Sequence, residues 1–292
     1  MNKVLRHPAS DWRSLASALV LVASLFTLSA CETTGIGGIG GSNESRAERM
    51  ARDGDHDDAA GAYMGLAVNA LGTERDRYTL LAVEQFLDAG DVNRARNAFS
   101  GVARQTTGSL EPIWITNQAA LHLYTGNADA ALNLLEPISR RPLSQRDRLR
   151  VEVLRADAWI QKQDPARAVE LMTQRETWID DRRGVEQNRS RLWQGLLASS
   201  PTVLRTAAEI SADPTVHGWL TIGSIAASTG QQGVGWSNGL VRWRTENPDH
   251  PAIMVLGDLD LPEHLLLEYP RQIALILPLS GNAATAGKAV QN

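Results

Sequence analysis

The chain of 292 residues is long enough for one large or two smaller domains, and its 43% hydrophobic residues can supply a substantial core. A formal net charge of −4 gives no general attraction for nucleic acid or anionic lipid head groups. The charge therefore argues against a nucleic-acid-binding protein. The single cysteine excludes an internal disulfide.

The first thirty residues have the three parts of an export signal. Basic residues lie within 1–13, and an apolar run of 14 residues follows from Leu15 to Leu28. This run is shorter than the ~20 residues that span a bilayer. Small residues, Ser29 and Ala30, then stand directly before Cys31. The pattern predicts a signal peptide over residues 1–30.

The end of this signal points to a lipid anchor. Leu28-Ser29-Ala30-Cys31 resembles the bacterial lipobox, in which the cysteine thiol is acylated and the cysteine becomes the new N-terminus. The resemblance implies lipidation of Cys31, and several acyl chains would make the attachment permanent. An ordinary signal peptide with an incidental cysteine is the alternative. In enterobacterial lipoproteins, Asp directly after the cysteine favours retention in the inner membrane. Glu32 stands at that position here, so the resemblance favours the outer membrane.

A glycine-rich stretch follows the predicted anchor. Gly35, Gly37 and Gly40 match the dinucleotide-binding spacing G-x-G-x-x-G. That motif requires a preceding strand and a following βαβ unit. Because this stretch begins four residues after Cys31, residues 31–43 are predicted to be a flexible tether instead.

A short pattern then recurs four times at nearly constant spacing. In each copy Gly or Gln is followed by Asp or Asn, with Ala five residues after the start and a large apolar residue nine after it. A second apolar position, twelve residues after each start, is interrupted in the fourth copy by Arg175. Successive copies are 36, 36 and 37 residues apart and begin at Gly54, Gly90, Gly126 and Gln163.

This repeat predicts a stack of helical hairpins. The first residue pair makes a tight turn, and Asp or Asn can cap the next helix. The small Ala lets two helices approach, and the apolar residue four positions later fills the space between them. The period is that of tetratricopeptide-type helix pairs, although their Trp-Leu-Gly-Tyr signature is absent. We therefore predict an all-α, tetratricopeptide-like helical-repeat solenoid over residues 44–255.

Weaker helical patterns continue this domain to about residue 250. They cover residues 188–199, 203–211, 216–228 and 234–246, and Asn247-Pro248 ends the last one. Trp236 and Trp243 lie seven residues apart on one face of the last pattern. This face can serve either a core or a partner surface.

The pattern changes after residue 255. Residues 256–271 are predicted to be a connector, and residues 272–279 form an apolar run typical of a strand buried in a parallel sheet. A turn follows, and residues 283–291 begin a helix. One strand and part of a helix cannot fold alone. Residues 272–292 are therefore expected to begin a truncated α/β domain of a longer protein.

No catalytic, cofactor or metal site is expected. Gly235–Gly239 matches the nucleophile elbow G-x-S-x-G, but an amphipathic pattern follows at once, which favours a helix start. Gly281–Lys288 approaches a phosphate-binding loop, but its spacing is one residue too long and Ala289 lacks the required hydroxyl. No metal-ligand spacing relates the histidines, which include His56, His122, His217, His250 and His264.

The order of these modules resembles one known family. A lipobox, a helical-repeat region, and the segments Arg271–Gly281 and Ala286–Asn292 resemble the LpoA family, penicillin-binding protein activators of gammaproteobacteria. Trp243–Ala252 is similar to the end of that family's helical domain. The final strand, turn and helix resemble the opening of a type I periplasmic-binding-protein fold. The chain is thus identified as an N-terminal portion of such a protein.

The resemblance implies a function in cell-wall synthesis. It implies a non-enzymatic outer-membrane lipoprotein that faces the periplasm and uses no cofactor. It also implies direct contact with a class A penicillin-binding protein, a bifunctional peptidoglycan synthase, whose transpeptidase activity it stimulates. Because that contact is attributed mainly to the family's C-terminal domain, Cys31 is the one functional residue transferred. A lipid-anchored periplasmic solute-binding receptor is the alternative.

Overall fold

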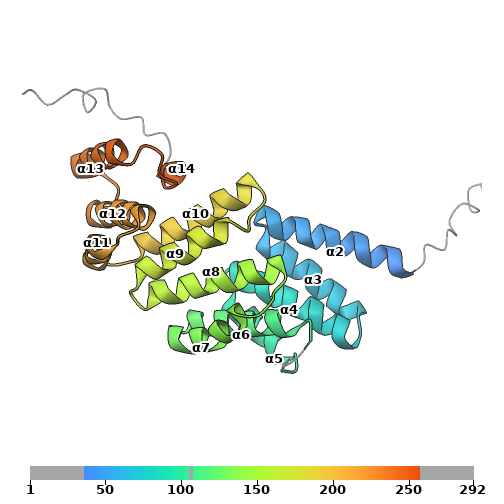
Figure 1. Cartoon of the computed structure of the whole chain (residues 1–292). Helices are drawn as coiled ribbons and strands as arrows, with labels where there is room; N and C mark the ends of the chain where they lie inside the picture. The colour runs from blue at the N-terminus through green and yellow to red at the C-terminus, as the bar shows by residue number, and fades with distance from the viewer. Residues whose placement is uncertain (1–35, 105–107, 257–292) are drawn as a thin grey trace, which may run out of the picture. The chain divides into compact units, whose positions relative to one another are not determined.

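The computed structural model describes residues 36–104 and 108–256, and side chains from Asn43 onward. Every regular element in these ranges is a helix (Figure 1), which confirms the predicted all-α class. In the same ranges no helix is both long and apolar enough to cross a membrane. Cys31 and the predicted strand at residues 272–279 lie outside the described residues. The chain divides into two compact units after Arg104.

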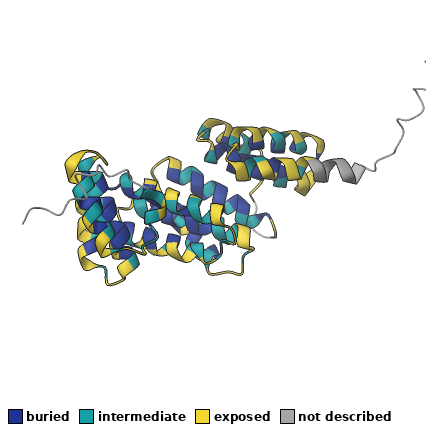
Figure 2. Ribbon diagram, turned by 90° about the horizontal axis from the view of Figure 1, so that it is seen from above, coloured by how far each residue is buried: buried dark blue, intermediate teal, exposed yellow. Residues whose placement is uncertain are grey.

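The first unit consists of four helices that pack in chain order. Their bounds are α2 (Ile36–Asp53), α3 (His56–Asn69), α4 (Gly72–Asp88) and α5 (Val92–Ser100). Helix α4 supplies most of the core: from Leu80 to Leu87 every residue is buried. Figure 2 shows this buried interior beneath exposed helix faces.

Helix α2 begins eight residues before the predicted start of the helical domain at residue 44. Its first residue is Ile36, so the glycine-rich stretch predicted as a tether is helical from that point. Packing at Ala47, which is fully buried, holds the second half of the helix. Once a helix is nucleated, each added residue gains a backbone hydrogen bond, and this offsets part of the conformational cost of glycine.

The second unit begins with two regular helical hairpins, and the packing order of its helices then becomes irregular. Helices α6 with α7 and α8 with α9 pair in sequence, and α10 packs on α9. After that, α11 and α12 pair with each other and both contact α9. The bounds are α6 (Glu111–Tyr124), α7 (Ala128–Ser139), α8 (Gln145–Gln161), α9 (Pro165–Glu176), α10 (Arg182–Leu197), α11 (Pro201–Ile210), α12 (Pro214–Thr229), α13 (Gly233–Glu246) and α14 (Ile253–Leu256).

The four predicted turns share one geometry. At the turn after α4, the Asp91 amide donates to the Phe86 carbonyl at 2.8 Å, and the Gly90 amide donates to the Leu87 carbonyl at 3.0 Å. This pair of bonds is the Schellman motif, which needs a left-handed residue after the helix. The same pair closes the other three turns. The left-handed residues have φ of 90°, 81°, 72° and 60° at Gly54, Gly90, Gly126 and Gln163.

At three of the four turns, the residue that follows the left-handed position caps the next helix as predicted. The side chains of Asp91, Asn127 and Asp164 each accept a hydrogen bond from a backbone amide in the first turn of the next helix, whereas Asp55 makes no such bond. The small repeat residues Ala59, Ala95, Ala131 and Ala168 are all 0% exposed. The tetratricopeptide-like packing is therefore confirmed at the level of individual positions.

Candidate functional site

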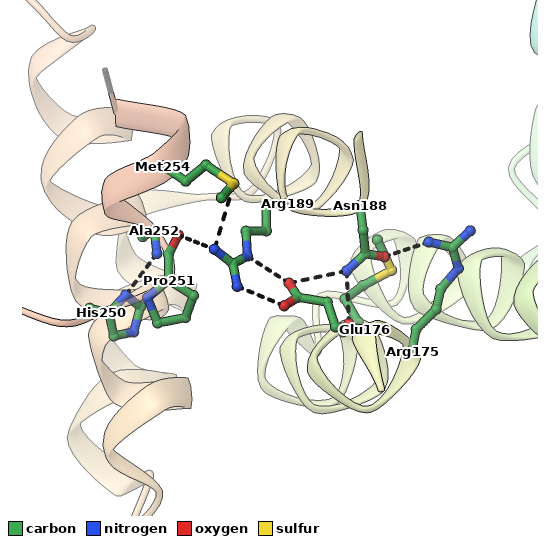
Figure 3. A network of polar contacts seen from close by, with 9 residues as sticks. Arg175, Glu176, Asn188, Arg189, His250, Pro251, Ala252 and Met254 are labelled. Carbon is green, nitrogen blue, oxygen red and sulfur yellow. Dashed lines mark hydrogen bonds and ion pairs between the residues drawn. The ribbon is translucent and has the colours of Figure 1, made fainter. Parts of the chain in front are cut away.

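A chain of polar contacts ties the last described helix, α14, to the body of the second unit (Figure 3). It begins at Arg175, the residue that interrupts the apolar repeat. Its Nε donates to the Leu149 carbonyl at 2.9 Å, and its Nη1 donates to Oδ1 of Asn188 at 2.6 Å. Burial is the main cause that lowers the pKa of Arg175 to about 10, and Arg191 adds repulsion. The residue remains a cation at neutral pH, bonded to neutral oxygens.

Asn188 joins helices α9 and α10. Its side chain is only 2% exposed. Its Nδ2 donates to the Met172 carbonyl at 2.9 Å and lies 3.4 Å from Oε1 of Glu176. Because its Oδ1 accepts from Arg175, the amide uses both ends of its side chain. A buried amide with both ends bonded favours one packing of the two helices.

Arg189 carries the network from α9 to the end of the described chain. Its Nε and Nη2 donate to the two carboxylate oxygens of Glu176, at 2.9 Å and 2.8 Å. This bidentate arrangement is the strongest geometry for an Arg–carboxylate pair. Its remaining nitrogen, Nη1, donates to the Pro251 carbonyl at 3.4 Å and lies 3.6 Å from Sδ of Met254.

His250 holds the segment just before α14. Its ring lies edge-on to two tryptophan rings, with centroids 5.6 Å from Trp219 and 5.0 Å from Trp243. Its Nδ1 accepts from the Ala252 amide at 3.1 Å. The proton must then be on Nε2, which donates to the Thr215 carbonyl at 2.9 Å. Burial lowers the pKa of His250, so the ring is held neutral.

The close approach beneath this ring requires a glycine in α12. A Cβ at Gly218 would lie 2.5 Å from Nε2 of His250 and 2.6 Å from its Cδ2. The Gly218 carbonyl also accepts a hydrogen bond from Nε1 of Trp243 at 2.9 Å. Gly218 therefore lets the ring and the indole pack directly on the α12 backbone.

These contacts position α14 and the segment directly before it. Together they fix α14 against the rest of the described second unit. Within residues 36–104 and 108–256, no group of three or more His, Cys, Asp or Glu side chains could hold a metal ion. Ser237, the serine of the G-x-S-x-G match, lies inside α13 and donates to the Gly233 carbonyl at 3.2 Å. The predicted helix start at that match is therefore confirmed.

Sequence reasoning located this region only in part. It noted Arg175 as a break in the repeat and the Asn247–Pro251 stretch as a helix stop, but it missed the roles of Glu176, Asn188 and Arg189. Trp236 and Trp243, left open between core and partner surface, are 7% and 1% exposed and belong to the core. Among the predicted positions, Cys31, His264 and Gly281–Lys288 lie outside the described residues.

Comparison with known proteins identifies the family of the chain. Residues 55–292 match a family model described as "LppC putative lipoprotein". The chain belongs to the LppC lipoprotein family. The match covers α3 to α14 as well as the sequence that follows them.

Relatives of this LppC-family chain have names that agree with the resemblance drawn from the sequence. The penicillin-binding protein activator LpoA of Photobacterium profundum is 25% identical over 297 residues, which cover 100% of this chain and 46% of the relative. LpoA of Glaesserella parasuis is 24% identical over 75% of this chain and 38% of the relative. The chain thus spans less than half the length of these relatives.

Solved structures confirm the fold. The N-terminal domain of LpoA from Haemophilus influenzae aligns with a TM-score of 0.55 and 19% identity, over 71% of this chain and 91% of that domain. Full-length LpoA from the same organism aligns with a TM-score of 0.55 over 80% of this chain and 43% of that protein. The described helices therefore share the fold of an LpoA N-terminal domain, as the resemblance implied.

Proposed function

We propose that this LppC-family protein is a non-enzymatic activator of cell-wall synthesis, anchored in the outer membrane and facing the periplasm. In this proposal the chain is cleaved before Cys31 and acylated on that residue. Its full-length form contacts a class A penicillin-binding protein and stimulates transpeptidation. The observation that carries the proposal is similarity along the whole chain to a relative named as a penicillin-binding protein activator.

The junction at α14 supports a positioning role for the helical units. Three sets of contacts hold the end of the described helices. They are the hydrogen bonds from Arg175 to two uncharged oxygens, the Arg189–Glu176 ion pair, and the hydrogen-bonded His250 ring. In this proposal α14 is therefore a fixed end of the described helices. The helices would then span distance from the lipid anchor and present the following region to its partner.

Reconstitution of the synthase tests the activator function. The soluble full-length protein, including the sequence that follows Asn292 in its relatives, is added to a purified class A synthase with its lipid-linked substrate. The measured quantity is the fraction of crosslinked peptides. The proposal expects this fraction to rise with the concentration of the added protein until it reaches a plateau. An unchanged fraction, with the protein folded by circular dichroism, would contradict it.

Lipid attachment is tested separately. Mass spectrometry of the protein purified from cell membranes should find a mature N-terminus at Cys31 that carries acyl groups. The matched control is Cys31→Ser, which removes the thiol and should leave an uncleaved precursor. A native protein that begins elsewhere, or that carries an unmodified Cys31, would overturn the anchor.

A lipid-anchored receptor for a periplasmic solute is the second candidate. The apolar run at residues 272–279 suggests it, because this sequence pattern predicts a strand of a parallel sheet, as expected at the start of a solute-binding domain. A thermal-shift screen of periplasmic solutes on the full-length protein separates the two functions. A reproducible shift without stimulation of the synthase favours the receptor.

A further inference from the structure

Two apolar side chains project from one tip of the first unit. Val68 and Leu71, at the turn between α3 and α4, are 81% and 86% exposed. The turn itself is well anchored. Ala70 between them is buried, its amide donates to the Ala67 carbonyl at 3.3 Å, and the Asn69 side chain donates to the Gly65 carbonyl at 2.9 Å. The two apolar groups are therefore held outward by a defined turn.

The residue choice at this tip works against the stability of α4. Leu71 is the N-cap residue of α4 and makes no side-chain hydrogen bond to the first turn. Ser, Thr, Asp or Asn at that position would satisfy a free backbone amide. An exposed leucine at a cap position therefore gives up a capping bond and also leaves apolar surface in water. Such local disagreement with folding rules is typical of functional positions.

The tip lies at the same end of the first unit as the start of α2, as Figure 1 shows. Glu44 of α2 accepts from Nη1 and Nη2 of Arg77 at 2.6 Å and 3.0 Å, and from the Tyr78 hydroxyl at 3.0 Å. These bonds fix how far α2 is shifted along its axis relative to α4, with Glu44 beside Arg77 and Tyr78. From there α2 extends back about 12 Å to Ile36, and α4 extends back about 8 Å to Gly72, at the helical rise of ~1.5 Å per residue. The start of α2 and the start of α4 therefore lie at nearly the same position along the helix axes.

The predicted lipid anchor lies close to this end in the sequence. Five peptide steps separate Cys31 from Ile36. At ~3.5 Å per residue they span at most about 18 Å. A membrane that holds Cys31 would therefore stay near the start of α2 and near the tip. Charges of both signs lie beside the tip: Glu74 is in the first turn of α4, and the exposed Arg75 pairs with Asp76 at 3.6 Å.

We propose that Val68 and Leu71 form a membrane contact and insert at the head-group boundary of the leaflet that holds Cys31. This rests on the proposed lipidation of Cys31. A tethered contact needs little affinity of its own, because the anchor already supplies a high local concentration of lipid. The contact would set the orientation of the first unit on the membrane.

The test uses the acylated protein, purified from membranes and reconstituted in phospholipid vesicles. Acylation converts the thiol of Cys31, the sole cysteine, into a thioether, so an introduced cysteine is the one free thiol. Val68→Cys carries an environment-sensitive fluorophore. Ile210→Cys, at an 80% exposed position of the second unit, carries the same label as the matched control. Mass spectrometry establishes acylation of each sample first.

A membrane contact predicts a blue-shifted emission at position 68 and loss of that emission when nitroxide-labelled lipids are included, with neither effect at position 210. Equal spectra at the two positions, with Cys31 acylated, would overturn the contact and leave the anchor standing. A blue shift that persists after the acylated N-terminal segment is removed, with neither lipid nor detergent present, would show that protein covers the tip, and would also overturn it. An unacylated Cys31 removes the anchor and this proposal together.

A second variant separates membrane contact from folding. Leu71→Ser supplies a capping hydroxyl and removes the apolar side chain. It should leave the unfolding transition unchanged or raise it, and abolish the lipid-dependent signal of a label at position 68. Lowered stability of Leu71→Ser would mean that the side chain is packed within the protein, which would contradict the proposal.

Discussion

Nε and Nη2 of Arg189 bind the two carboxylate oxygens of Glu176, at 2.9 Å and 2.8 Å, and so join α10 to the end of α9. Both side chains are about four-fifths buried, with 18% and 21% exposure. Arg189→Ala should therefore lower the free energy of unfolding by about 1.5–3 kcal/mol, the range for hydrogen bonds between charged groups. Urea denaturation of the second unit measures the change.

Arg189→Lys is the matched control for this pair. It keeps the charge but cannot bind both carboxylate oxygens in one plane. It should therefore recover only part of the stability that Arg189→Ala loses. Full recovery would show that the charge alone matters and would contradict the importance of the bidentate geometry.

His250 should make stability depend on pH. Its pKa is lowered by burial from the ordinary 6.5, so the unfolded chain binds the proton more readily than the folded one. Its contribution is complete above pH ~6.5 and is lost as pH falls from there through the native-state pKa. Protonation would also place a proton on Nδ1, which accepts from the Ala252 amide. The free energy of unfolding should therefore fall between pH 7.5 and 5.5.

His250→Gln provides the comparison, because it cannot titrate. Urea unfolding of both proteins at several pH values should show a steeper loss below pH ~6.5 in the natural protein. Parallel pH profiles would rule out a lowered pKa at His250. Carboxylates that keep a low pKa, such as Glu44 beside Arg77, titrate below this window.

Gly218→Ala should destabilise the second unit. The added Cβ would meet the His250 ring at 2.5 Å, and the ring is confined by Trp219 and Trp243. Overpacking of this kind typically costs about 1–3 kcal/mol. Gly235→Ala is the control within the same unit, because its Cβ would meet only Thr229 Cγ2 at an ordinary 3.5 Å. Thermal unfolding should separate the two variants, and equal melting temperatures would contradict the close packing.

Gln163→Gly should stabilise the fourth repeat turn. Gln163 has a φ of 60°, a left-handed conformation that the other three turns assign to glycine. A side chain in this left-handed conformation costs about 1–2 kcal/mol of folding free energy. Glycine removes that cost, but part of the gain is lost because glycine makes the unfolded chain more flexible. We expect a gain of up to about 1 kcal/mol in urea unfolding. Gly126→Ala should show the opposite sign, and a loss of stability in Gln163→Gly would contradict the argument.

The repeat turns were predictable because they depend on neighbouring residues. A left-handed residue, a capping Asp or Asn and a buried Ala recur at fixed spacing, and each has a local physical reason. The start of α2 at Ile36 and the division after Arg104 were not predicted. A repeat pattern encodes how each helix packs on the next one, so it says little about where a stack begins or divides.

Of the polar contacts that hold α14, only the residue that interrupts the apolar repeat was predictable from the sequence. Arg175 stood out because an apolar residue was expected there. Its partners carry no such signal, since Asn188 and Arg189 are ordinary residues of a helix, and the contact from Arg189 to Pro251 joins positions 62 residues apart. Long-range polar contacts of this kind follow from the folded geometry and have no periodicity in the sequence.

The bonds that hold α14 also have a mechanical consequence. A pull on the chain beyond Leu256 would first load the His250 ring between its two indoles and the Arg189 guanidinium, and from there pass to α9 and α10. Force applied to α14 would therefore reach the packed helices of the second unit through side-chain contacts as well as through the backbone.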